Sequence, residues 1–467
     1  MDEMTRPVAP STDDLLRTLH PDCPDWERLG PTRRDAAVRA AAVAAEVADE
    51  ERTSAWAGGF NRRAFLKGGL GVGVATLGAQ LVTTRVSYSA EAASTTTSNG
   101  TLVVIFLRGG MDGLSMLVPV ADPMLARARP TIAVRARSAM EFDAKRGFGL
   151  HPALAPLAPL ITAGKVAAVP AVSTPDLSRS HFQAQDCLER GSSTTLTSGW
   201  LDRVLAASGP GTTFRSVAVG GNTPRSLIGT SNSMAMYDLD SIQLYVDPSE
   251  KSRTTRALEK LYTGVHHPIA TQTRLAVGAL ATVDGIRKAQ PAKPAVTYPE
   301  GNFADALQSL AALIKGRAGV RVACVDVGGW DTHTGMGTVD SGDMMRHLGD
   351  LAAALAAFTT DIGSAALEKT TIVTMSEFGR RIEENASGGT DHGHGGAVLV
   401  IGGGVNGGVH GAWHGLSGHL TVEGDVPGWN DYRDVLSEVV MKRVGLSAGK
   451  IPSVFPGWKP KKVGVMR

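Results

Sequence analysis

The segment T-L-V-V-I-F-L-R-G-G-M-D-G, residues 101–113, decides the fold. Its first seven residues are apolar or β-branched without interruption, which is typical of a strand buried on both faces of a sheet. The two glycines that follow indicate a tight turn where the strand ends. Asp112 lies in this turn, so we expect its carboxylate at the carboxyl end of the strand.

Five further apolar runs predict buried strands, and helical periodicity lies between them. The runs are Lys165–Ser173, Ser216–Gly220, Gly319–Val327, Thr370–Met375 and Ala397–Ile401. The helical patterns are Pro152–Ala163, Ser180–Glu189, Ser249–Tyr262, Ile269–Lys288, Asn302–Lys315, Gly342–Ile362 and Asp431–Val444. Buried strands that alternate with helices predict an α/β domain whose largely parallel sheet is sandwiched by helices. In such sheets, ligands bind at the carboxyl ends of the strands.

The composition indicates a folded protein with no nucleic-acid partner. Of the 467 residues, 43% are hydrophobic and 20% are charged, which excludes a wholly disordered chain. The net charge is only +2, so the chain lacks the basic field that nucleic acid attracts. The three cysteines form no C-x-x-C pair, and the sequence leaves a disulfide between Cys187 and Cys324 open. Two buried free thiols are favoured, because cysteine is among the most buried residue types.

Residues 61–67, N-R-R-A-F-L-K, resemble the twin-arginine export signal. A Gly-rich apolar stretch follows at residues 68–84, and Ala90-Glu91-Ala92 offers the small residues that signal peptidase needs. The apolar stretch is too short and too rich in glycine for a stable membrane span. We therefore expect export by the twin-arginine translocation machinery, cleavage near Ala92 or Ala93, and a periplasmic, cell-surface or secreted mature chain.

These signals predict three regions along the chain. Residues 1–60 form an acidic extension, in which twelve Asp and Glu stand against seven Arg. Residues 61–92 form the signal region, and residues 93–467 form one α/β domain. Within that domain, the Ser/Thr/Gly-rich residues at about 192–242 suggest a small inserted cap.

Side chains able to bind a metal follow or precede several of the predicted strands. They are Asp112, then Asp331 and His333 in G-G-W-D-T-H, Glu377 in S-E-F-G-R, and Asp391, His392 and His394 in G-T-D-H-G-H-G. Imidazole mixed with carboxylate suits zinc, manganese or iron. The alternative is that these residues cap loops and turns, which is common beside glycine. We expect a divalent metal centre with one or two ions, most simply zinc or manganese.

The segment T-P-D-L-S-R-S-H-F, residues 174–182, contains a candidate nucleophile. Ser180 is placed to cap the next helix, whose N-terminus favours negative charge, with Arg179 before it and His181 in the first turn. A metal or Arg179 can lower the pKa of such a hydroxyl enough for nucleophilic attack. Ser178 is the rival nucleophile, and plain helix capping is the alternative role for Ser180.

Taken together, these motifs and the leader resemble one known family. The motifs F-L-R-G-G-M-D-G, S-R-S-H-F, G-G-W-D-T-H, S-E-F-G-R and G-T-D-H-G-H-G resemble the family called domain of unknown function 1501, over about residues 101–444. That family looks like a remote branch of the alkaline-phosphatase and sulfatase superfamily, which implies an alkaline-phosphatase-like fold. The resemblance implies metal ligands at Asp112, Asp331, His333, Glu377, His392 and His394, and a nucleophile at Ser180 or Ser178.

The chain also departs from the superfamily's pattern. Asp331 and His333 are two residues apart where the phosphatases usually have four, and Glu377-Phe378 stands where Asp-His is common. The formylglycine signature C-x-P-S-R is absent, which excludes that class of sulfatase. We expect an exported metal-dependent hydrolase of phosphate or sulfate esters that acts on a small anionic ester or a cell-surface glycan. The alternatives are a non-catalytic exported binding or structural protein on the same fold and, if iron or copper binds, an exported redox protein.

Overall fold

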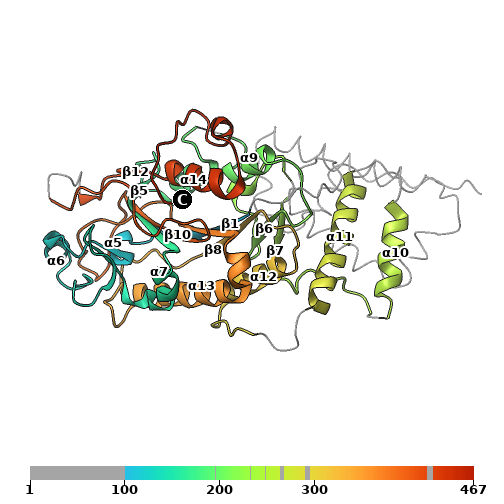
Figure 1. The fold of residues 1–467 in the computed structure, drawn as a ribbon, viewed down its shortest axis with the longest axis horizontal. Coiled ribbons are helices and arrows are strands. Elements are labelled where there is room, and N and C mark those ends of the chain that lie inside the picture. Colours follow the sequence, from blue (N-terminus) through green and yellow to red (C-terminus); the bar gives the residue numbers. More distant parts are fainter. Residues whose placement is uncertain are drawn as a thin grey trace, which may run out of the picture. The chain divides into compact units, whose positions relative to one another are not determined.

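The computed structural model describes residues 100–467, except 195, 232, 248, 263–267, 290–294 and 418–423. The acidic extension, the predicted export signal, its predicted cleavage site and Cys23 lie outside the described residues. The described part is built around one nine-stranded sheet with helices on both faces (Figure 1).

The central sheet is mixed and mostly parallel. Its strand order is β11-β5-β10-β9-β1-β8-β6-β7, and β12 pairs with β5. Within the described part, β10 runs antiparallel to both of its neighbours and the remaining pairs are parallel. The strands are β1 (Thr101–Leu107), β5 (Val166–Ser173), β6 (Ser216–Val219), β7 (Met234–Met236), β8 (Val322–Val327), β9 (Thr370–Met375), β10 (Gly396–Gly402), β11 (Gly408–Val409) and β12 (Asn430–Asp431). The predicted α/β class and all six predicted strands are thus confirmed.

β1 occupies the middle of the sheet because its side chains are apolar on both faces. It pairs in parallel with β8, where Val104 lies opposite Cys324, and with β9, where Val104 lies opposite Val373. All of its residues are buried. Ile105 belongs to the hydrophobic core on one face, and Phe106 belongs to the core on the other.

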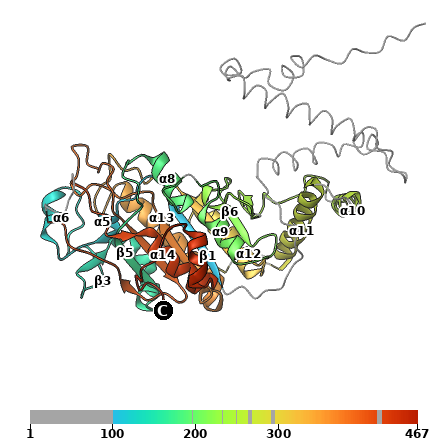
Figure 2. The same ribbon diagram turned by 90° about the horizontal axis from the view of Figure 1, so that it is seen from above.

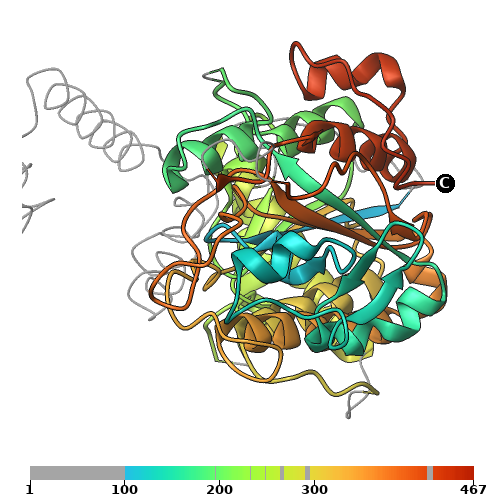
Figure 3. The same ribbon diagram turned by 90° about the vertical axis from the view of Figure 1, so that its left-hand side faces the viewer.

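Two helical layers cover these cores, as Figures 1 and 3 show. One layer comprises η2 (Pro152–Leu157), α7 (Ala158–Thr162), α12 (Asn302–Lys315) and α13 (Asp343–Leu367). The other comprises α8 (His181–Arg190), α9 (Trp200–Ala207), α14 (Tyr432–Val439), η6 (Val440–Val444) and α15 (Ile451–Val454). Seen from above, α9 and α14 lie over the sheet (Figure 2). The first layer contributes mainly leucine and alanine to the core, with Phe358, and the second contributes mainly leucine and valine, with Trp200.

The remaining elements lie at the margins of this sandwich. A small antiparallel sheet consists of β2 (Leu117–Val118), β4 (Phe148–Leu150) and β3 (Met140–Asp143). The short helices are α5 (Gly113–Met116), α6 (Pro123–Ala128), η3 (Arg225–Leu227) and η7 (Ala448–Lys450). Two longer helices, α10 (Lys251–Tyr262) and α11 (Pro268–Ala289), pack against each other.

Two sequence-based expectations and one further property of the helices can be compared with this fold. Residues 192–242, expected as an inserted cap, contain α9 and η3 and supply β6 and β7 to the central sheet. Cys187 and Cys324 are both free and buried, as the burial preference of cysteine favours. Within the described residues, α13 is long and apolar enough to cross a membrane, but Leu348 and Phe358 bury one side of it in the core.

The sheet topology brings the candidate site residues to one edge. β1, β5, β8 and β9 point the same way, so their carboxyl ends meet at this edge. β10 runs in the opposite direction, and its amino end therefore reaches the same place. The segments that follow the four parallel strands and the segment that precedes β10 can thus contribute side chains to one point.

Candidate metal centre

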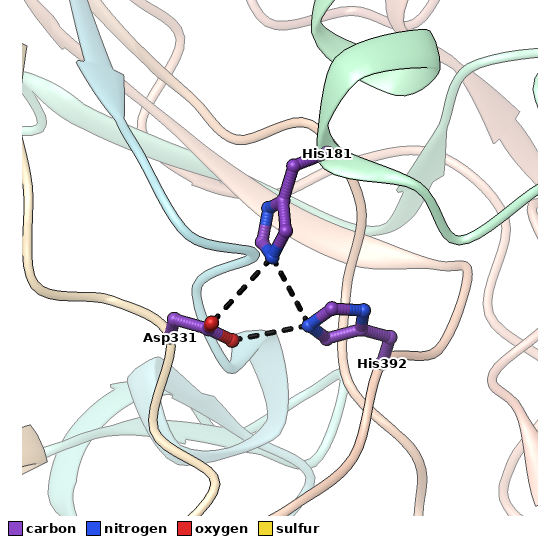
Figure 4. Close-up of side chains that lie close together, drawn as sticks. All are labelled: His181, Asp331 and His392. Atoms are coloured by element: carbon purple, nitrogen blue, oxygen red, sulfur yellow. Dashed lines mark hydrogen bonds and ion pairs between the residues drawn. The ribbon is translucent and has the colours of Figure 1, made fainter.

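Three side chains from separate segments meet at this edge: His181, Asp331 and His392 (Figure 4). His181 begins α8, Asp331 follows β8, and His392 precedes β10. His392 Nε2 lies 3.1 Å from both His181 Nε2 and Asp331 Oδ1. His181 Nε2 lies 3.5 Å from Asp331 Oδ2. One ligand atom from each residue therefore falls within 4.8 Å of the other two.

A fourth side chain, His333, adjoins this group. Its Nε2 lies 3.0 Å from His392 Nε2 and 3.1 Å from Asp331 Oδ1. Ligand atoms around a tetrahedral zinc ion, with bonds of ~2.1 Å, are ~3.4 Å apart. The separations of 3.0–3.5 Å given above are close to this value, but His333 is not part of the group of three residues whose ligand atoms all lie within 4.8 Å of one another. We call His181, Asp331, His333 and His392 the His/Asp cluster.

Each imidazole of the His/Asp cluster has an acceptor on its other ring nitrogen. The contacts are His181 Nδ1 to Glu377 Oε1 at 2.9 Å, His333 Nδ1 to Asp391 Oδ1 at 3.1 Å, and His392 Nδ1 to the Arg179 carbonyl oxygen at 3.0 Å. A carboxylate or carbonyl oxygen can only accept, so each Nδ1 carries a proton that it donates. In the neutral imidazoles the Nε2 lone pairs are then directed into the cluster.

These lone pairs give the His/Asp cluster the properties of a metal site. Burial lowers the pKa of His392, which favours its neutral form near pH 7. Two neutral Nε2 acceptors at 3.0–3.1 Å cannot bond to one another, whereas a cation between them satisfies both. An acceptor on the far nitrogen is also the usual way in which proteins orient a metal-binding histidine. The residues present therefore fit a divalent ion such as zinc or manganese.

Arg380 holds Asp331 in the anionic form. Its fully buried guanidinium donates to Asp331 Oδ1 at 2.5 Å and to the carbonyl oxygens of Gly110 and Thr390. Partial burial raises the pKa of Asp331, but contacts with Arg380 and His392 outweigh this effect and lower the pKa to about 2. Arg380 is therefore a positioning residue inside the protein, a role that its place in S-E-F-G-R did not reveal.

Two predicted metal ligands, Glu377 and Asp391, contact the outer Nδ1 atoms of imidazoles in the His/Asp cluster. The Glu377 side chain is fully buried and accepts hydrogen bonds from His181 and from the Gly109 and Gln185 nitrogens, each at 2.9 Å. Burial raises the pKa of Glu377, but hydrogen bonds from Gln185 and His181 keep it below its usual value. Asp391 is half-exposed and similarly contacts His333. Both carboxylates orient imidazoles through Nδ1.

The structure places the predicted ligands Asp112 and His394 outside the His/Asp cluster. The Asp112 carboxylate accepts from the Arg129 guanidinium at 2.6 and 2.8 Å and from the Ser115 N–H, and both charged side chains are fully buried. Asp112 thus neutralises a buried arginine and caps α5. His394 is half-buried, and this burial lowers its pKa although the nearby Asp425 carboxylate acts in the opposite direction. Neither residue therefore belongs to the group of side chains that can share one ion with His181, and both predictions are corrected.

The predicted nucleophile region has two different serines. Ser180 is the N-cap residue of α8, but its hydroxyl makes no capping hydrogen bond. Ser178 Oγ donates to Asp176 Oδ2 at 2.7 Å and accepts from the Ser180 N–H at 3.1 Å. The Ser178 hydroxyl is therefore engaged in the turn, whereas that of Ser180 is not used to cap the helix. His181, predicted as a catalytic residue, belongs to the His/Asp cluster.

Comparison with known proteins identifies the family. A family model described as "Protein of unknown function (DUF1501)" matches residues 151–426, and the chain belongs to this family. A search of curated proteins found no match.

Two solved structures show distant similarity to the chain. The PsFucS1 sulfatase from Pseudoalteromonas sp. is 13% identical, with a TM-score of 0.32, over 85% of this chain and 76% of the sulfatase. An alkaline phosphatase from the Antarctic bacterium TAB5 is 9% identical, with a TM-score of 0.26, over 78% of this chain and 100% of the phosphatase. Similarity at this level carries no argument about chemistry, which is therefore argued from the chain's own residues.

Proposed function

We propose that this member of the DUF1501 family is an exported metal-dependent hydrolase of phosphate or sulfate esters. The observation that carries the proposal is the convergence of three imidazole Nε2 atoms on Asp331, with an acceptor on the far nitrogen of each ring. Zinc or manganese is the ion that this donor set suits.

The charge around the His/Asp cluster also favours a divalent cation. Three carboxylates contact its imidazoles, namely Asp331, Glu377 and Asp391. One guanidinium, that of Arg380, contacts Asp331. With neutral histidines, these groups carry a net charge of −2, which a divalent ion neutralises.

The chain's own residues supply the rest of the proposed chemistry. When bound, a divalent ion acts as a Lewis acid that stabilises negative charge on the transferred group and lowers the pKa of a hydroxyl. Ser180 directly precedes His181 and lies at the N-terminus of α8, where the helix dipole favours negative charge. We assign the nucleophile to the Ser180 hydroxyl, whose oxygen attacks the phosphorus or sulfur atom. The bond from that atom to the ester oxygen breaks, and the alcohol leaves with the proton of the hydroxyl. Water then cleaves the serine ester, which releases phosphate or sulfate and restores Ser180.

The cellular setting is inferred from the leader. We propose that the twin-arginine machinery carries the chain out of the cytoplasm, on the evidence of N-R-R-A-F-L-K at residues 61–67. That machinery transports folded proteins, which suits a chain that binds its ion before export. The proposed substrate is a small anionic ester or an ester on a cell-surface glycan.

Metal content is the first test. We expect one or two equivalents of zinc or manganese, by plasma mass spectrometry, in protein exported and purified in its native form. His392→Ala and Asp331→Ala should abolish this metal, whereas the control His410→Ala should keep it, because His410 contacts the Asn406 carbonyl instead. If the purified and reloaded wild-type chain holds no stoichiometric metal, the proposal is wrong.

Hydrolysis is the second test. We expect the metal-loaded protein to cleave p-nitrophenyl phosphate or p-nitrophenyl sulfate, and Ser180→Ala to lose this activity. Ser178→Ala is the matched control and should retain it, since the Ser178 hydroxyl is occupied in the turn. Undiminished hydrolysis by Ser180→Ala would refute the nucleophile. Stoichiometric metal without cleavage of either ester class would favour a non-catalytic binding protein.

A further inference from the structure

An ion pair between Arg179 and Asp425 lies directly behind His392. The Arg179 Nε and Nη2 atoms are 3.0 and 2.6 Å from Asp425 Oδ2. The Asp425 side chain is only 8% exposed. The backbone carbonyl of the same arginine accepts the His392 Nδ1–H at 3.0 Å. One residue thus joins a buried carboxylate to an imidazole of the His/Asp cluster.

The backbone of Arg179 is strained where it makes this link. Its φ is +55°, in the left-handed region that residues other than glycine rarely adopt. Such a conformation persists only where surrounding contacts hold it, and it is most common at functional sites. The charged hydrogen bonds from the Arg179 guanidinium to Asp425 supply a contact of this kind.

Asp425 itself is firmly anchored but incompletely satisfied. An isolated β-bridge joins Asp425 to Arg381, and a second bridge joins Arg380 to His392, so both partners of Arg179 sit on neighbouring backbone segments. Asp425 Oδ1 is buried and has no hydrogen-bond partner among the described residues. A buried ion pair is weak evidence for stability, and an unsatisfied buried oxygen costs free energy. A contribution to fold stability therefore does not by itself explain the ion pair between Arg179 and Asp425.

We propose that Asp425 is a positioning residue that prepares His392 for metal binding. Asp425 holds the Arg179 guanidinium, which keeps the strained backbone in place, and the Arg179 carbonyl then fixes the proton on His392 Nδ1. The His392 Nε2 lone pair is thereby directed toward His181 and Asp331. This inference rests on the proposed function, because it concerns the same His/Asp cluster.

The first arm of the test measures metal affinity. Asp425→Asn keeps the shape of the side chain and removes its charge, and we expect zinc to bind about 10–100-fold more weakly in competition with a chelator. The matched control is Asp361→Asn, whose carboxylate pairs with Lys315 at 2.6 Å and whose side chain is 10% exposed. This control should bind zinc like the wild type. Equal affinities for wild type and Asp425→Asn would overturn the proposal.

A second variant separates the effect of the Arg179–Asp425 ion pair from the effect of the strained Arg179 backbone. Arg179→Gly tolerates the positive φ without cost but lacks the guanidinium. We expect Arg179→Gly to weaken zinc binding as much as Asp425→Asn does, and the double variant to lose no more than either single one. Wild-type affinity in Arg179→Gly would show that the Asp425 anchor is unnecessary. This variant also covers the case in which Asp425→Asn fails to fold.

The final arm does not depend on bound metal. In nitrogen-15 NMR of metal-free protein labelled at histidine, His392 should carry its proton on Nδ1 in the wild type and in Asp361→Asn. It should show a mixture of tautomers in Asp425→Asn. An unchanged tautomer in Asp425→Asn would overturn the positioning role. A wild type that binds no zinc would refute the proposed function, and a tautomer that differs between the wild type and Asp425→Asn would still show that Asp425 orients His392.

Discussion

Replacing Glu377 by glutamine removes a buried negative charge without removing its hydrogen bonds. Glu377 Oε1 accepts from the Gly109 N–H, His181 Nδ1 and Gln185 Nε2, each at 2.9 Å, and a glutamine oxygen can accept the same three. Glu377 Oε2 lies 3.1 Å from Ser376 Oγ, which can accept from a glutamine NH₂. Glu377→Gln therefore tests the effect of the charge on His181.

The expected effect is large on metal binding and small on folding. Partners of the far imidazole nitrogen are typically worth about 10–100-fold in metal affinity, or about 1.4–2.7 kcal/mol. The free energy of unfolding of metal-free Glu377→Gln should lie within about 1 kcal/mol of the wild type, because no donor loses its acceptor. Glu377→Ala instead leaves three donors without an acceptor, and should lose about 3 kcal/mol or more of stability.

Two measurements on the same preparations separate the effect of the Glu377 charge on metal binding from its effect on folding. Zinc dissociation constants come from chelator competition, and free energies of unfolding come from urea titration of the metal-free proteins. We expect Glu377→Gln to change only the zinc dissociation constant, and Glu377→Ala to change both this constant and the free energy of unfolding. Wild-type zinc affinity in Glu377→Gln would refute the reasoning, since the charge behind His181 would then have no influence on the metal.

Three further changes test other parts of the structure. Asp112→Ala leaves the buried Arg129 guanidinium without its partner, so urea titration should show a loss of about 3–5 kcal/mol with zinc content unchanged; lost zinc at unchanged stability would instead make Asp112 a ligand. Gly109→Ala forces a side chain into a backbone with φ +128° and against the Asp331 amide nitrogen, so zinc affinity should fall at least about tenfold, and an unaltered dissociation constant would contradict this. Burial lowers the pKa of His151 to about 4, below its value in the unfolded chain. Between these two pKa values the unfolded chain binds more protons than the folded one. The free energy of unfolding should therefore fall by up to about 3 kcal/mol as the pH is lowered from 6.5 to 4. In the metal-free protein, His151→Asn should weaken the dependence of the free energy of unfolding on pH. An equally steep pH dependence in His151→Asn would show that another group takes up the proton.

The central strands could be predicted because their signal is local. The β1 and β9 segments, Thr101–Leu107 and Thr370–Met375, were predicted with the bounds that the structure shows. Uninterrupted apolar runs of this length can bury both faces only inside a sheet covered by helices on each side. The antiparallel direction of β10 was not foreseen, because an apolar run predicts a strand but not its direction.

The sequence also indicated where the site lies. Asp331 and His392 were predicted as ligands because they adjoin strand ends, and the topology brings them together with His181. His181 was assigned to catalysis, since its position beside Ser180 at a helix start suggested that chemistry. The signal that could have revealed its role is the apolar run just before it, Lys165–Ser173, whose carboxyl end brings this helix to the same sheet edge.

The roles within the site depended on the tertiary structure. Glu377 and Asp391 are carboxylates within the sequence motifs that were expected to bind metal, yet the structure places them behind the imidazoles, on Nδ1. Asp112 was indistinguishable from them until folding placed the Arg129 guanidinium against it.

The sequence by itself determined six strands of the central sheet, seven helical segments, and the edge of the sheet that collects the polar residues. The hydrophobic pattern and the glycine turns act over a few residues and need no distant partner. Only the tertiary structure decided which of those polar residues share a point. His181 and His392 are 211 positions apart in the chain, and their contact depends on strand order, register and side-chain rotamers together. These are properties of the packed molecule, because each is set by residues far away in the sequence.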